Sequence, residues 1–177
     1  MKKNYLFIYI SLISLFLSSC IKEDVKSFQG NTVVEFDATV FNSVAAGFAY
    51  PILTRAAGYG RAVSTADPSL TRTSGQIKLR VNLVGQQRST VEVISYQVLT
   101  VTPTSPNLLG ASGTHYNTSG TFTIPANSSF GEVVINILNP GISSTIAREV
   151  HLELQGSSTN IKASENYKKI AIRIAQN

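Results

Sequence analysis

From residue 32 onward, the sequence consists of short segments in which apolar and polar residues alternate, separated by turn-forming residues. The clearest segment runs from Ile77 to Leu83, where the apolar residues alternate with Lys78, Arg80 and Asn82. A period of two residues is typical of a strand with one buried face and one solvated face. The same reasoning predicts strands within residues 32–40, 47–54, 90–101, 121–124, 131–138, 150–154 and 170–174.

Three details refine this pattern. Pro51 lies inside the second segment, which predicts an edge strand or a bend there because proline cannot donate to a strand ladder. The alternation in residues 90–101 changes before Tyr96, as a β-bulge would cause. Residues 55–74 are rich in Gly, Ser, Thr and Ala and predict a long loop. Polar residues that alternate with apolar ones are expected on strand exteriors: Glu35, Asp37, Glu92, Glu132, His151 and Glu153.

Seven to eight short strands without helical periodicity after residue 20 predict an all-β protein. Strands that are apolar on one face are satisfied when two sheets pack face to face. We therefore expect an immunoglobulin-like antiparallel β-sandwich, with a closed barrel as the alternative. At 177 residues, one domain is the default, and residues 32–177 are expected to form it.

The first twenty residues read MKKNYLFIYISLISLFLSSC. A short basic start and an apolar run too short to span a bilayer predict a signal peptide over residues 1–19. The run ends in Leu-Ser-Ser-Cys, which resembles the lipobox of bacterial lipoproteins. Cleavage before Cys20 and lipidation of its sulfur and freed amine would give stable anchoring, because two or three acyl chains suffice where one is marginal.

Residues 20–31 are expected to form the lipidated cysteine and a flexible tether. Lys22, Glu23 and Asp24 resemble the export signal of surface lipoproteins in the Bacteroidota, a lysine followed by two acidic residues. The resemblance implies an outer-membrane lipoprotein exposed at the cell surface, with a periplasm-facing anchor as the alternative.

Charge and cysteine content exclude several classes. Charged residues make up 14% of the chain, with 15 basic and 10 acidic residues. Once the leader is removed, Lys168-Lys169 is the one basic pair, so the clustered basic face of a nucleic-acid-binding protein is not expected. Cys20 is the single cysteine, which excludes a disulfide within the chain and a cysteine-based zinc site.

Residues 110–138 read GASGTHYNTSGTFTIPANSSFGEVVINIL. The small-residue turn before His115-Tyr116, the strand ending in Ile-Pro-Ala and the following apolar strand resemble Calx-β-type and related immunoglobulin-like domains of Bacteroidota surface lipoproteins. The likeness covers about residues 75–175. It implies the sandwich fold and a role at the cell surface, near nutrient-uptake machinery such as SusC/SusD-like importers.

Calcium-binding members of that group carry clustered acidic residues in their loops, because Ca²⁺ takes six to eight oxygen ligands. Here His115 stands at the acidic position of the turn. Asp24, Asp37 and Asp67 are the only aspartates after the leader. We therefore expect no calcium, and no other metal or cofactor.

Catalytic chemistry is not predicted either, and the chain is expected not to be an enzyme. His115 and His151 are its only histidines, and each is better explained as a structural or solvated residue than as the base of a nucleophile. A glycosidase needs two carboxylates about 5–10 Å apart, and no spacing in the sequence points to such a pair.

The leading hypothesis is a non-enzymatic surface lipoprotein, bound to the membrane by its lipid, that serves as an accessory or interaction module of an outer-membrane uptake or adhesion system. Its partner would be a transporter complex or a glycan. The alternative is a glycan-binding protein in its own right. Tyr59 and Arg61 are the speculative ligand-binding residues, because glycines 58 and 60 expose the tyrosine. A small hydrolase is a third hypothesis.

Overall fold

The computed structural model describes residues 30–37, 48–56, 58 and 61–177. The predicted signal peptide, Cys20, the Lys22-Glu23-Asp24 segment and Tyr59 lie outside these residues. The described residues contain no helix of the length and apolar character needed to cross a membrane.

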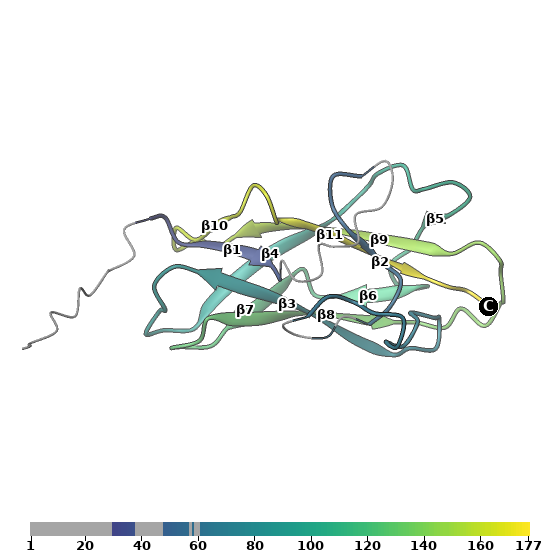
Figure 1. Ribbon diagram of the computed structural model, residues 1–177, viewed down its shortest axis with the longest axis horizontal. Coiled ribbons are helices and arrows are strands. Elements are labelled where there is room, and N and C mark those ends of the chain that lie inside the picture. Colours follow the sequence, from purple (N-terminus) through teal and green to yellow (C-terminus); the bar gives the residue numbers. More distant parts are fainter. Residues whose placement is uncertain (1–29, 38–47, 57, 59–60) are drawn as a thin grey trace, which may run out of the picture.

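The described chain forms eleven strands in two sheets. Figure 1 shows how these strands pack into a sandwich. The first sheet has the order β10-β1-β3-β8-β6 and the second β2-β11-β9-β4-β7, with β5 paired to β9. The bounds are β1 Val33–Phe36, β2 Ile52–Leu53, β3 Gln76–Val84, β4 Glu92–Leu99, β5 Leu108–Leu109, β6 Tyr116–Thr118, β7 Thr121–Ile124, β8 Phe130–Ile137, β9 Arg148–Gly156, β10 Lys162–Ala163 and β11 Lys169–Ile174.

The strands form where apolar residues recur at every second position. In β3, the side chains of Ile77, Leu79, Val81 and Leu83 are buried, while the residues between them face outward. The matching residues of β8, β9 and β11 meet them from both sheets in one continuous core. Each fully buried aliphatic side chain in such a core stabilises the fold by roughly 1.5–3 kcal/mol.

The all-β sandwich predicted from the sequence is confirmed. All eight predicted strands are present, and three short ones (β5, β6 and β10) were not predicted. Pro51 directly precedes β2, which lies at an edge of the second sheet as expected. The pairing of β4 with β9 shifts register between Ser95 and Tyr96, where a bulge was predicted.

Several predicted strand exteriors were wrong. Glu92 is 6% exposed and bonds to the Thr159 hydroxyl, while Val91 and Val93 beside it are each 57% exposed. Asp37 is also buried, and its backbone N–H donates to the carbonyl of Arg80 (3.1 Å). His151 does face away from the core, but it is fully buried because a second layer of residues covers the outer face of β9.

Candidate functional site: a groove at the seam between the sheets

A groove in the described part of the chain follows from a crossover between the two sheets. β6 pairs with residues Ile135–Ile137 of β8 in the first sheet. After Ser119 and Gly120 the chain crosses to the second sheet, where β7 pairs with β4. Because β6 ends early, the first half of β8 has β3 on one side and β7 beside it on the other. This seam holds a groove of about 510 Å³, within the range of about 300–1,000 Å³ typical of ligand pockets.

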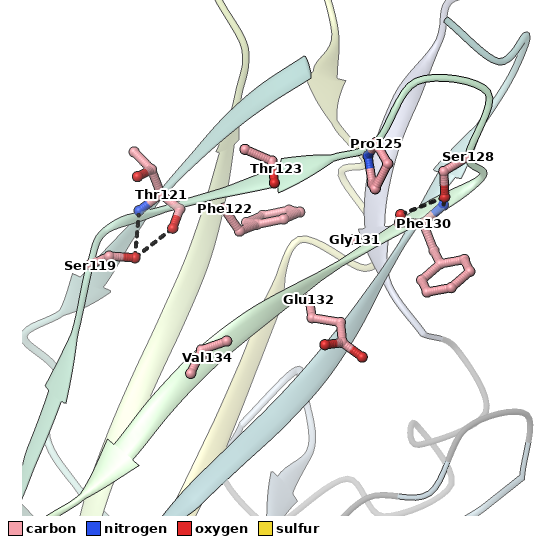
Figure 2. A pocket seen from close by; sticks show the side chains of 10 residues that line it. All are labelled: Ser119, Thr121, Phe122, Thr123, Pro125, Ser128, Phe130, Gly131, Glu132 and Val134. Carbon is pink, nitrogen blue, oxygen red and sulfur yellow. Dashed lines mark hydrogen bonds between the residues drawn. The ribbon is translucent and has the colours of Figure 1, made fainter. Parts of the chain in front are cut away.

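The floor of the groove is apolar and tightly closed. Figure 2 shows the ring of Phe122 between the ribbons of β7 and β8. At Gly131, a Cβ atom would come within 2.5 Å of the Thr123 carbonyl oxygen and 2.9 Å of the Phe122 ring. A glycine here therefore lets the two strands approach closely. Val134 and Pro125 complete the apolar lining.

The rim of the groove is polar. Thr121 and Thr123 are exposed on β7, and Glu132 lies across from them on β8. The Glu132 carboxylate forms an ion pair with Lys78 Nζ at 2.8 Å. Phe130 is 37% exposed, and the guanidinium of Arg80 lies 4.3 Å from the centre of its ring. A cation over an aromatic face is attractive, so Arg80 helps to fix the ring of Phe130.

Serine side chains form hydrogen bonds with backbone groups at both strand edges of the seam. Ser119 Oγ donates to the Thr121 carbonyl (2.5 Å) and accepts from the Thr121 N–H (3.4 Å), as drawn in Figure 2. Ser128 Oγ bonds in the same way to the carbonyl and N–H of Phe130 (2.9 and 3.2 Å). In addition, Thr118 Oγ1 donates to the Val134 carbonyl (2.9 Å). These backbone groups already have hydrogen-bond partners, which disfavours the addition of another strand at these edges.

A second polar cluster lies under the layer that covers β9. The fully buried Glu149 carboxylate accepts hydrogen bonds from Arg173 Nε (2.9 Å) and from the side-chain amide of Asn107 (3.1 Å). It also forms an ion pair with Arg173 Nη2 at 2.8 Å. Its other oxygen lies 3.0 Å from His151 Nε2 and accepts from the backbone N–H of Thr104 (3.3 Å). This Glu149 cluster therefore joins β9 and β11 to the loop that precedes β5.

The chemistry of His151 in this cluster is structural. Burial lowers the pKa of His151, although the neighbouring Glu149 raises it in part, so the ring is neutral near pH 7. A carboxylate only accepts, hence Nε2 carries the proton and Nδ1 accepts from the Tyr50 hydroxyl (3.0 Å). Phe48 packs against the same ring, with centroids 5.1 Å apart. The Tyr50, His151 and Glu149 side chains are all buried, which leaves no room for a substrate beside them.

The structure describes some of the predicted site residues. Tyr59 lies outside the described residues, and Arg61 is paired with Asp67, with Nη1 donating to Oδ2 at 2.8 Å. That pairing, with the backbone N–H of Ser64, holds the pKa of Asp67 far below its usual range. His115 accepts a bond at Nδ1 from the backbone N–H of Ala111 (3.0 Å), the structural role that was predicted.

The grouping of the acidic and histidine side chains bears on metal binding and on acid catalysis. In the described part of the chain, no three His, Cys, Asp or Glu side chains are grouped so as to hold a metal ion. Burial alone would raise the pKa of Glu153, but the bond from Gln97 and the charges of Lys169 and Lys168 outweigh it and lower that pKa. A glycosidase acid needs the opposite shift.

Comparison with known proteins places the fold. The sandwich has a fold similar to that of Calx-β domains. It is similar to the apo form of the Calx CBD1 domain, with a TM-score of 0.52, 11% identity, and coverage of 84% of this chain and 99% of that one. At this identity the likeness shows the fold alone.

Two further solved structures are less similar. The Calx CBD2 domain has a TM-score of 0.43 and 14% identity, over 59% of this chain and 78% of that one. A two-domain protein of unknown function from Bacteroides fragilis NCTC 9343 has a TM-score of 0.49 and 8% identity, over 82% and 45%. No family model matches the sequence, and no curated protein matches it either.

Proposed function

We propose that this chain is a non-enzymatic surface lipoprotein whose β-sandwich is an interaction module of an outer-membrane uptake or adhesion system. The observation that carries the proposal is the seam groove. Of its ten lining residues, Glu132 is the single ionisable one. Acid–base or nucleophilic chemistry needs at least two groups within reach of each other, whereas an open groove with an apolar floor and a polar rim suits binding.

The sequence supports the location. Leu17-Ser18-Ser19-Cys20 and the single cysteine support lipidation at Cys20, and Lys22-Glu23-Asp24 supports transfer to the outer face. β1 begins at Val33, about a dozen residues after Cys20. An extended chain spans at most about 3.3–3.6 Å per residue, so the tether would hold the sandwich within roughly 45 Å of its anchor.

Protease shaving of intact cells tests this proposal. The native protein is compared with a variant in which Lys22, Glu23 and Asp24 are all alanine, and with Cys20→Ser. We expect the native protein to be cut, the triple variant to be protected inside the cell envelope, and Cys20→Ser to be released from the membrane fraction. If the native protein resists while a known surface protein is cut, the surface location is wrong.

A further inference from the structure

The residues that line the seam groove indicate which class of molecule it could bind. The floor is apolar, through Phe122 and Val134, and the rim carries hydroxyl groups and one carboxylate. A molecule that fits both must have an apolar face and many hydroxyl groups around its edge. Sugar rings have this combination, because their C–H groups lie on the ring faces and their hydroxyls project outward.

The charges around the groove narrow the ligand further. Glu132 is the one charged residue in the lining, and the adjacent Lys78 is already paired with it at 2.8 Å. A carboxylate accepts from sugar hydroxyls and repels anionic groups. None of the ten lining residues is a lysine or arginine that could pair with a sulfated or uronic sugar. A neutral saccharide is therefore the better match.

The edges of the groove argue against a peptide. A peptide that adds to a sheet edge gains affinity from main-chain hydrogen bonds. Here the hydroxyls of Ser119, Ser128 and Thr118 already bond to the backbone of Thr121, Phe130 and Val134. An incoming strand would have to break these bonds first, whereas a saccharide would use side chains at the rim and leave the edges intact.

We propose that the seam between β7 and β8 is a binding site for neutral saccharides, with Phe122 at its floor, Phe130 at its rim, and Thr123 and Glu132 as hydrogen-bonding groups. This inference rests on the proposed surface role and names the ligand class. The aromatic, hydroxyl and carboxylate groups come from two strands that the crossover at Ser119 and Gly120 brings together (Figure 2).

The test uses the lipoprotein extracted from cells in a detergent without a sugar headgroup, since a glycosidic detergent would compete. It is applied to an array of neutral gluco-, manno-, xylo- and galacto-oligosaccharides, and binding to the best ligand is then measured by calorimetry. Thr123→Val removes the hydroxyl and keeps the shape. Glu132→Gln removes the charge and Phe130→Ala the ring. Matched controls away from the groove are Thr102→Val and Ile142→Ala, both at exposed positions.

We expect Thr123→Val and Phe130→Ala each to weaken binding by about threefold to tenfold, and Glu132→Gln by tenfold or more, because bonds to charged groups are stronger. The controls should bind as the native protein does, and thermal melting should show every variant folded. Absence of binding to any neutral oligosaccharide overturns the site, as does binding that the shape-preserving variants leave unchanged, or a preference for extended peptides. Protease shaving reports the surface role separately, so either proposal can fail without the other.

Discussion

The Glu149 cluster makes a quantitative test of how the second sheet is held together. Glu149→Gln preserves the shape of the side chain but turns one oxygen into an NH₂ donor. One carboxylate oxygen faces Arg173 and Asn107, and the other faces His151 and the Thr104 N–H. In either orientation the new NH₂ group points at two existing donors. The charge of Arg173 also loses its closest partner, at 2.8 Å.

The expected loss is large. Removing one partner of a buried charge pair destabilises a protein by about 3–5 kcal/mol. In a domain of this size, 1 kcal/mol shifts the melting temperature by roughly 3 °C, so we expect a fall of about 10 °C or more. The free energy of unfolding is measured by urea titration at pH 7.5, followed by circular dichroism, with thermal melting as a second readout.

Glu153→Gln is the matched control, because Glu153 lies on the same face of β9 with 15% of its side chain exposed, whereas Glu149 is fully buried. It is paired with Lys168 and Lys169 at the longer distances of 3.7 and 3.6 Å, and both lysines reach solvent. Pairs near the surface contribute about 0–1 kcal/mol. If Glu149→Gln lowers the free energy of unfolding no more than this control does, the Glu149 cluster does not stabilise the second sheet as described. Adding Arg173→Met to Glu149→Gln should destabilise less than the two single losses combined, because the unpaired cation is gone.

Two further outcomes follow from local geometry and from titration. Gly156 has φ +97°, and a Cβ there would overlap the Ile161 carbonyl, whereas Gly75 has φ +69° with open space around it. Gly75→Ala should therefore lower the free energy of unfolding by about 1–2 kcal/mol, from the left-handed backbone alone. Gly156→Ala should lower it by at least about 2 kcal/mol more, because of the overlap. Urea titration measures both, and equal losses would contradict this expectation. Burial lowers the pKa of both His151 and His115, so below pH 6.5 the unfolded chain binds protons that the folded chain does not. The free energy of unfolding should fall between pH 7.5 and pH 5.5, and a flat or rising dependence there would show that the buried rings are not held neutral.

Local alternation predicted the strands well, because the core selects for it directly. In β3 and β11, every second residue is apolar and buried. In β4 the same rule failed, since Val91 and Val93 were the apolar candidates and Glu92 was expected outside. Glu92 is buried because Thr159, from a loop far along the chain, provides its hydrogen bond. A partner so distant in sequence leaves no trace in local periodicity.

His151 and the groove show a second reason why some features could not be predicted from the sequence. Alternation correctly placed His151 on the side of β9 away from the core. Whether that side meets water depends on Phe48 and Tyr50, which pack over it from another segment. In the same way, the Ser119-Gly120 turn looks like the tip of a hairpin, yet the strands on either side of it belong to different sheets. The groove exists only because of that crossover.

The position of β11 bears on how the chain folds. This last strand lies inside the second sheet, between β9 and the early strand β2, with Ile172 beside Leu53. Pairings between residues so far apart in sequence form slowly, because a long loop must close before any contact rewards it. The second sheet thus has a gap between β2 and β9 until the C-terminal residues are available. A shortened chain lacking β11 would expose edges on both of those strands, and aggregation would then compete with folding.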